Sequence, residues 1–177
     1  MGVSQAELDA LRIAIDTEKE GYHFFKKAKE MAKTEITRDL FDTLMKDELL
    51  HQKVIEEYYR KLTNEGSRKE VKEVEAELQK SSGTFKTIFS EATENPEKVL
   101  EGIEDDIKNV QLAIDFEKNG QNMYRKLART VTDPKAVQFY EFLERMEEEH
   151  EEALDETLRY LRDPDSYYLN AEGWTME

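Results

Sequence analysis

Residues 14–25 read AIDTEKEGYHFF, and residues 113–124 read AIDFEKNGQNMY. The two segments are versions of one helical sequence, with a glutamate at the same place in each, 99 residues apart (117 − 18 = 99). Each segment is followed by a second matching segment that ends in the motif Glu-x-x-His, again 99 residues apart. The chain is therefore an internal duplication, and the duplicated unit carries potential metal ligands. These candidate ligands are Glu18, Glu48 and His51 in the first half and Glu117, Glu147 and His150 in the second.

The spacing of these residues fits a metal site built between helices. At about 3.6 residues per turn, positions i and i+3 lie roughly one turn apart on the same side of a helix, so Glu and His can serve one site. One Glu from each of two helices and Glu-x-x-His from each of two others is the ligand set of the ferritin-like di-metal carboxylate bundle. Four carboxylates balance the charge of two divalent ions, and the imidazoles bind as neutral groups.

Helix-start signals and apolar periodicity predict four long helices. In each of them the apolar residues recur at three- and four-residue steps, and the candidate ligands interrupt this apolar stripe. A glutamate on a core face requires a partner, whereas an exposed one does not. The predicted helices span residues 5–33, 35–62, 97–130 and 134–162, and begin at Ser4-x-x-Glu7, Thr34, Pro96 and Asp133-Pro134 respectively.

These helices predict an all-α, ferritin-like four-helix bundle. Residues 67–96 supply the one long crossover, between helices two and three, that such a bundle requires. We expect residues 1–162 to form the bundle, crossover included. The tail, residues 163–177, contains two tyrosines and a tryptophan, so we expect it to fold back onto the bundle.

The combination of the six residues is more specific than either motif alone. A single Glu-x-x-His is a weak signal in a chain rich in Glu, but here two of the three histidines fall in the same motif on a core face. Without cations, four converging carboxylates would face desolvation and mutual repulsion. The third histidine, His23, has Asn122 as its counterpart, and we interpret it as structural or exposed.

Several neighbours of the candidate ligands allow more than one interpretation. Tyr22, Tyr58 and Tyr124 lie on the ligand faces, where they donate hydrogen bonds to carboxylates, give up electrons, or simply belong to the core. Helix rotation points Asp16, Asp115, Asp47 and Glu149 away from the site, so a solvated role or a contact behind a ligand is expected for them. Gly21 and Gly120 also match at the 99-residue offset. They either make room for an oxygen species or for close helix approach, or they are inherited packing without a role in chemistry.

Composition narrows the function further. The 177 residues contain no cysteine, which excludes disulfides, thiolate zinc sites and iron–sulfur clusters from them, so any metal must take oxygen and nitrogen ligands. A net charge of −15 argues against a nucleic-acid or anionic-membrane partner. The sequence has neither an apolar run of membrane-spanning length nor a signal pattern at its start, so we expect a cytoplasmic protein.

The sequence resembles the rubrerythrin branch of the ferritin-like superfamily over about residues 5–162. The motifs that carry the resemblance are Glu18, Glu48-Leu-Leu-His51, Glu117 and Glu147-Glu-Glu-His150. The resemblance implies a non-haem di-iron centre that reduces hydrogen peroxide or reacts with dioxygen. It also implies the role of each ligand: Glu48 and Glu147 as bridging carboxylates, Glu18 and Glu117 as terminal ones, and His51 and His150 as one nitrogen ligand per metal.

The sequence departs from the family in two respects. The rubredoxin-like domain of typical rubrerythrins, with its four cysteines, has no counterpart in these residues, which implies an external electron donor such as a rubredoxin. Gly120 stands where the family has a second glutamate one turn after the ligand of helix three.

Alternatives remain at the level of the sequence. Manganese is the alternative to two iron ions. The alternative functions are a ferroxidase that handles iron, or a helical interaction module with a structural metal. The resemblance to rubrerythrins implies a homodimer or small homo-oligomer rather than the large cage that ferritins form.

Overall fold

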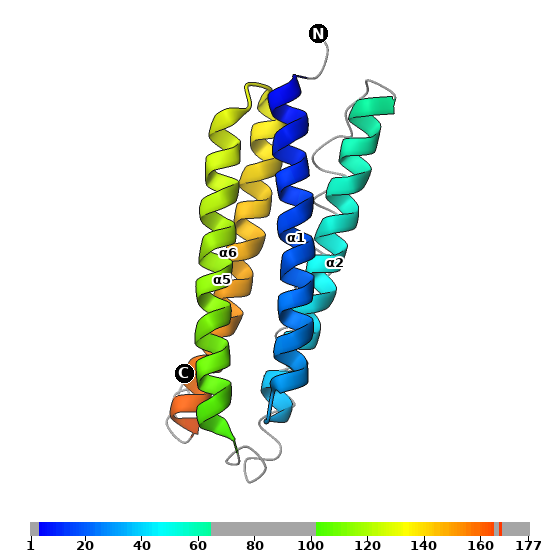
Figure 1. Cartoon of the computed structure of the whole chain (residues 1–177). Coiled ribbons are helices and arrows are strands. Elements are labelled where there is room, and N and C mark those ends of the chain that lie inside the picture. The colour runs from blue at the N-terminus through cyan, green and yellow to red at the C-terminus, as the bar shows by residue number, and fades with distance from the viewer. Residues whose placement is uncertain (1–3, 65–101, 165–166, 168–177) are drawn as a thin grey trace, which may run out of the picture.

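Four long helices lie side by side in the computed structural model, which describes residues 4–64, 102–164 and 167 (Figure 1). α1 packs chiefly against α2, and α5 packs chiefly against α6, so the molecule consists of two helical hairpins. The expected four-helix bundle is confirmed. The helices are α1 (Gln5–Met31), α2 (Glu35–Asn64), α5 (Ile103–Thr130) and α6 (Pro134–Arg162).

Local sequence signals set most of the helix ends. The Ser4 side chain accepts a hydrogen bond from the backbone N–H of Glu7, and the Asp133 side chain accepts from Lys135 and Ala136, with Pro134 in the first turn. These are the predicted caps of the first and fourth helices.

The predicted start of the third helix was wrong. Helix α5 begins at Ile103 rather than at residue 97, because Gly102 takes the left-handed conformation (φ 86°, ψ 11°), which a continuous helix excludes. Pro96 and the expected crossover, residues 67–96, lie outside the described residues. The first helix ends at Met31, two residues earlier than expected.

A buried aspartate ties the two hairpins together at one end of the bundle. Asp106 of α5 is fully buried and accepts hydrogen bonds from the backbone N–H groups of Lys33 (2.9 Å) and Thr34 (2.7 Å). It also accepts one from the Thr34 hydroxyl (2.7 Å), which itself lies 3.4 Å from the Thr37 amide as a cap of α2. The α1–α2 connection is therefore held by a carboxylate from the other hairpin. The counterpart of Asp106 in the first half, Glu7, is also buried.

The core has two apolar clusters with the candidate ligands between them. Along α1, Glu18 lies between Ala14 of one cluster and Phe25 of the other. On the other three helices the candidate ligands likewise lie between residues of the two clusters. The polar layer thus lies in the middle of the bundle. The first cluster includes Leu11, Ile55, Tyr58, Tyr124, Phe139, Tyr140 and Leu143, and the second includes Phe25, Phe41, Leu44, Val110, Ile114, Leu154 and Leu158.

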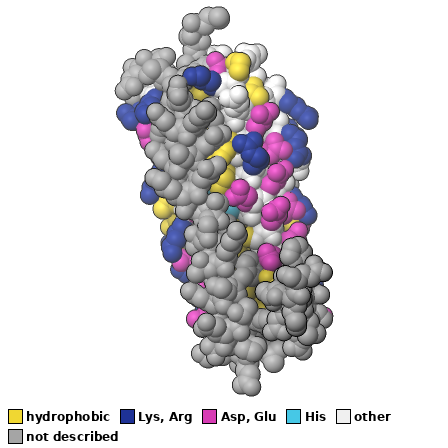
Figure 2. Space-filling model, turned by 180° about the vertical axis from the view of Figure 1, so that it is seen from behind, with side chains coloured by type: hydrophobic (Ala, Val, Ile, Leu, Met, Phe, Trp, Pro, Cys, Tyr) yellow, Lys and Arg dark blue, Asp and Glu magenta, His cyan; other side chains and the backbone are white. Residues whose placement is uncertain are grey.

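The surface is charged, and one tail residue contacts the bundle. Figure 2 shows Asp and Glu side chains interleaved with Lys and Arg on the described part of the rear face. Tyr167 donates a hydrogen bond to Glu156 (2.7 Å), and its ring meets the ring of Tyr160 edge-on. Residues 168–177 of the expected tail lie outside the described part. Among the helices described, none has the length and apolarity to span a membrane.

Candidate metal centre

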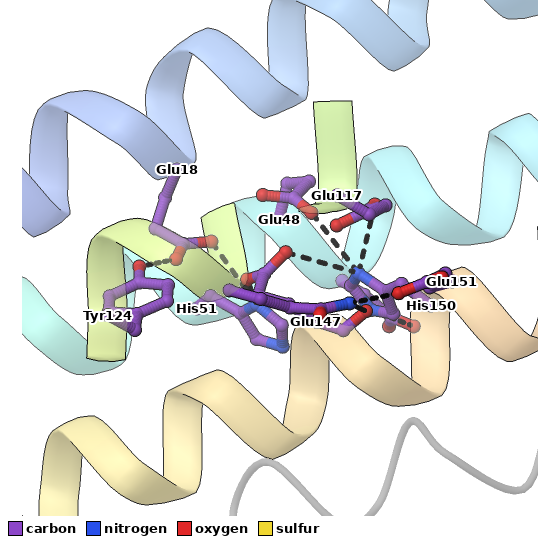
Figure 3. A network of polar contacts seen from close by, with 10 residues as sticks. Glu18, Glu48, His51, Glu117, Tyr124, Glu147, His150 and Glu151 are labelled. Carbon is purple, nitrogen blue, oxygen red and sulfur yellow. Dashed lines mark hydrogen bonds and ion pairs between the residues drawn. The ribbon is translucent and has the colours of Figure 1, made fainter. Parts of the chain in front are cut away.

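All six candidate ligands converge in the middle of the bundle, one from each of α1 and α5 and two from each of α2 and α6 (Figure 3). They are buried, with at most 3% of each residue exposed. Their donor atoms form two sets of four, and within each set all atoms lie within 4.8 Å of one another. We name the two sets by their histidines. The His51 position comprises Glu18, Glu48, His51 and Glu147, and the His150 position comprises Glu48, Glu117, Glu147 and His150.

Two carboxylates, those of Glu48 and Glu147, belong to both positions. Each position consequently takes three residues from its own hairpin and one from the other. This is the arrangement in which two residues can bridge two ions while the remaining carboxylates and imidazoles each serve one ion.

Both imidazoles turn the same ring nitrogen towards the carboxylates. His51 Nδ1 lies 3.2 Å from Glu18 Oε2 and 3.9 Å from Glu147 Oε1. His150 Nδ1 lies 3.3 Å from Glu48 Oε1 and 3.3 Å from Glu117 Oε1. The rings are stacked with centroids 5.3 Å apart. Nδ1 is therefore the nitrogen that each histidine presents to the centre.

The charge of this cluster suits divalent cations. Among the described residues, the ion-pair partners of the four glutamates are the two histidines and no Lys or Arg. Buried carboxylates without a permanent cation must be protonated or must bind a metal. Carboxylate oxygen and imidazole nitrogen are ligands that iron and manganese accept, so the residues present fit two such ions.

Without metal, the cluster retains protons instead. Burial raises the pKa of Glu18 to about 8. Burial and the neighbouring carboxylates together raise the pKa values of Glu48 and Glu147 well above the ordinary value. Burial also opposes the ionised form of Glu117, but the charges and hydrogen bonds of its neighbours outweigh it and lower the pKa.

The two histidines differ in the same metal-free state. Burial, together with repulsion from His150, lowers the pKa of His51. Burial disfavours the charged form of His150 too, but Glu117 and Glu48 outweigh it and raise the pKa well above its ordinary value. A metal ion at this position would displace the proton from Nδ1.

The matched glycines make room for the shared carboxylates. A Cβ atom on Gly21 would lie 2.5 Å from Glu48 Oε2, and one on Gly120 would lie 3.2 Å from Glu147 Oε2. The space that the sequence suggested for an oxygen species is thus filled by carboxylates. The nearest atoms beside each glycine come from the glutamates of α2 and α6, and not from a close approach of α1 and α5. Inherited packing without a role does not explain why both glycines face a glutamate shared by the two positions.

The other residues that the sequence singled out have different positions. Tyr124 donates a hydrogen bond to Glu18 Oε1, whereas Tyr58 packs in the apolar core against Phe139, and Tyr22 lies partly exposed beside His23. His23 is exposed, as expected. Asp16, Asp115 and Glu149 are exposed too, so the solvated role holds for these three.

Asp47 is the exception among these acids. It is buried, and its Oδ2 lies 3.8 Å from His150 Nε2, behind the face that His150 presents to the centre. The sequence also missed Gln121, which donates hydrogen bonds to the carbonyl oxygen of Glu147 and to Glu151. Its place on the core stripe of the third helix was the signal that could have identified it.

Comparison with known proteins agrees with this geometry. The family model described as Rubrerythrin matches residues 9–158, which is most of the chain and includes all six candidate ligands. Searches of curated proteins and of solved structures gave no match. The family match, the four-helix bundle and the buried carboxylate and histidine cluster together show that this chain belongs to the rubrerythrin family.

Proposed function

We propose that this protein is a non-haem di-iron oxidoreductase, which reduces hydrogen peroxide or dioxygen with electrons from an external donor protein such as a rubredoxin. The observation that carries the proposal is the pair of four-residue ligand sets that share Glu48 and Glu147. Its ligands are Glu18, Glu48, His51, Glu117, Glu147 and His150. We also propose that the protein acts in the defence against oxidative stress, with manganese as the alternative metal.

Two ferrous ions held by these six residues would supply one electron each, and with two protons these electrons would convert hydrogen peroxide to two molecules of water. The protein supplies the surroundings for this reaction. Glu48 and Glu147, which belong to both ligand sets, would hold the two ions together, and the burial of all six residues would keep bulk water from them. Tyr124 donates its hydroxyl proton to Glu18 Oε1, which leaves Oε2, at 3.2 Å from His51 Nδ1, as the oxygen that would hold an ion.

Gly120 bears on the choice of substrate. It lacks a side chain that could enter the centre, and Glu147 occupies the adjoining space. In the family, the second glutamate at this place is expected to exchange with a histidine as a metal ligand during turnover. Glycine at position 120 has no side chain that could do so. The same centre with a fixed ligand set also supports reaction with dioxygen, which is why the proposal includes both oxidants.

The test is anaerobic loading with Fe(II), measurement of iron per chain, and visible spectra after stoichiometric hydrogen peroxide and, separately, dioxygen. We expect two irons per chain and a rapid ferric absorption band. A faster response to peroxide assigns a peroxidase, and a faster response to dioxygen assigns an oxidase or ferroxidase. Bound metal that neither oxidant changes would overturn the proposal in favour of a structural metal.

A matched pair of variants tests the bridging role. We expect Glu48→Gln and Glu147→Gln each to abolish binding of the second ion, because an amide cannot share negative charge between two cations. Glu149→Gln is the control, since Glu149 is exposed on the same helix as Glu147. A Glu48→Gln protein that still holds two irons as tightly as the wild type would contradict the bridging assignment.

Assembly is a separate question that the same preparations answer. Ile13, Met31 and Leu112 are the exposed large apolar side chains in the described part of the chain, and Ile13 and Leu112 occupy matching positions of the two halves (112 − 13 = 99). We propose that the protein forms a homodimer or small homo-oligomer. Light scattering distinguishes this from the large cage that an iron-storage protein would form.

A further inference from the structure

The two halves of the centre differ in their surroundings although their ligands match. The carboxylate of Asp47 lies behind His150, with Oδ2 at 3.8 Å from Nε2. The position 99 residues later is Met146, a buried core residue whose thioether carries no charge. Among the described residues, both ion-pair partners of His51, Glu18 and Glu147, contact its Nδ1, and no acid stands beside its Nε2 as Asp47 stands beside that of His150. The duplication has therefore kept the ligands and lost the symmetry of the residues that support them.

A carboxylate behind a metal-binding histidine changes its strength as a ligand. A histidine that binds metal through one ring nitrogen carries its proton on the other, and a carboxylate that accepts this proton fixes the ring and makes the ligating nitrogen more basic. Asp47 lies on the side of His150 where this proton would be, since Nδ1 of His150 faces the glutamates and Nε2 faces Asp47. The separation of 3.8 Å is an ion-pair distance, longer than a hydrogen bond.

A second difference acts on the terminal carboxylates. Tyr124 donates a hydrogen bond to Glu18 Oε1, so one oxygen of that ligand is engaged before any metal arrives. The counterpart of Tyr124 is Phe25, a fully buried residue whose ring has no hydroxyl to donate to Glu117. A hydrogen bond to a carboxylate makes it a weaker base, so both differences favour the same position.

We propose that the two metal positions are unequal: the His150 position binds its ion first and more tightly because Asp47 positions His150, while the His51 position fills second. This inference rests on the proposed di-metal centre and adds an order of filling to it. Asp47 acts through His150 and does not itself bind the ion. The consequence is that the protein can hold one resident ion and exchange the other.

The experiment is a titration of the full-length, metal-free protein with Co(II) under anaerobic conditions, followed by visible absorption and calorimetry. Two identical positions would also fill in two steps, because neighbouring cations repel. The location of the first ion is therefore the deciding result. We expect crystals grown with one equivalent of Co(II) to show anomalous scattering at the His150 position. Equal scattering at both positions, or more at the His51 position, would overturn the proposal.

Variants then connect the order to its cause. We expect Asp47→Asn to lower the affinity of the first step by about 10- to 100-fold and to leave the second step nearly unchanged. Met146→Leu, at the matching place in the other half, is the control for altered core packing and should change neither step. Thermal unfolding of the metal-free variants separates loss of folding from loss of metal affinity. An equal decrease in both steps for Asp47→Asn would contradict a role specific to His150.

A further variant, Tyr124→Phe, tests the order of filling without changing Asp47. Tyr124→Phe releases Glu18 Oε1 and should raise the affinity of the second step by about fivefold, the equivalent of one ordinary hydrogen bond. An effect on the first step instead would contradict the assignment of the two positions.

The two proposals, the di-metal centre and the order of filling, fail in different ways. A wild-type protein that never takes up a second ion refutes the di-metal centre. Two ions held at positions of equal occupancy refute only the order of filling.

Discussion

At the scale of single residues, the candidate centre depends on two glycines, which have no Cβ atom, as much as on its candidate ligands. Glycine in a helix interior destabilises the helix by about 1 kcal/mol relative to alanine, yet α1 and α5 each have one beside a shared glutamate. At Gly21 the glutamate carboxylate occupies the volume that a methyl group would need. Both helices therefore have the less stabilising residue at the position where a shared glutamate needs the space of a side chain.

This arrangement predicts that stability and metal binding respond in opposite directions to one substitution. Gly21→Ala places a Cβ atom 2.5 Å from Glu48 Oε2. The tip of a glutamate can move, so the fold should persist and the metal-free protein should gain up to about 1 kcal/mol from helix propensity. The displaced carboxylate should then fail to hold two ions. Urea unfolding and metal content, measured on the same sample, check both halves of the prediction.

Gly120→Ala is the matched comparison. The corresponding distance is 3.2 Å, so Glu147 has to move by only a few tenths of an ångström, and this variant should keep both ions with reduced affinity. Wild-type metal binding in Gly21→Ala would show that Glu48 does not need its observed position.

At the scale of elements, the hairpins are joined where a connection of one is hydrogen-bonded by a helix of the other. Asp106 serves three donors at the α1–α2 connection while being fully buried. Hydrogen bonds to a charged group contribute about 1.5–3 kcal/mol each, and donors left buried without a partner cost about 1–3 kcal/mol.

We therefore expect Asp106→Ala to lower the free energy of unfolding by about 3 kcal/mol or more, which urea denaturation would measure. Its neighbour Asp105 is exposed and provides the control, for which a change below about 1 kcal/mol is expected. A similar loss in both variants would indicate a general charge effect at the start of α5 rather than the specific contacts of Asp106.

The helices also show how far a single sequence leads. The caps at Ser4 and Asp133 were predicted because their hydrogen bonds are local, within a few residues of the chain. The start of α5 was missed because Gly102 breaks the helix by its backbone conformation, whereas Gly21 and Gly120 continue one. Nothing in the residue type distinguishes these cases, since glycine permits both conformations.

For the candidate site, the duplication made the six candidate ligands recognisable, since each half repeats the other. The contacts behind them were less predictable. Whether Asp47 reaches a histidine, and which one, depends on how far α2 and α6 are shifted along each other, and no feature within one helix encodes that shift. The same holds for Tyr124 of α5, which reaches Glu18 of α1 in the other hairpin.

At the scale of the whole molecule, the buried cluster makes stability depend on pH in an unusual direction. In the metal-free protein the pKa of Glu18 is raised to about 8, and the pKa values of Glu48, Glu147 and His150 are also raised. Groups with raised pKa values hold more protons in the folded state, so their contribution is present below the unfolded pKa and is lost as pH rises through the folded one. His51, with its lowered pKa, opposes this trend only below about pH 6.5.

Metal-free protein should therefore lose stability as pH rises from about 6.5 to 8, whereas most proteins change little there. With both ions bound, the carboxylates are balanced by the metals, and stability should be nearly independent of pH in this range. Thermal unfolding in a pH series, with and without metal, measures the difference. Calorimetry in buffers of different ionisation enthalpy should also show proton release on metal uptake at pH 7. A pH-independent metal-free protein would contradict the protonated cluster.

Each position includes one glutamate from the other hairpin, and this has a consequence for the origin of the molecule. Each hairpin contains one single glutamate and one Glu-x-x-His motif, and the glutamate of that motif also belongs to the position of the other hairpin. Two identical copies of such a hairpin, related by a twofold axis, would already complete both positions. The duplicated sequence is what the fusion of two copies of a half-length polypeptide, paired as a dimer, would give. Fusion of two such copies would let each half change separately, and the present chain has Asp47 in one half and Met146 at the matching position of the other.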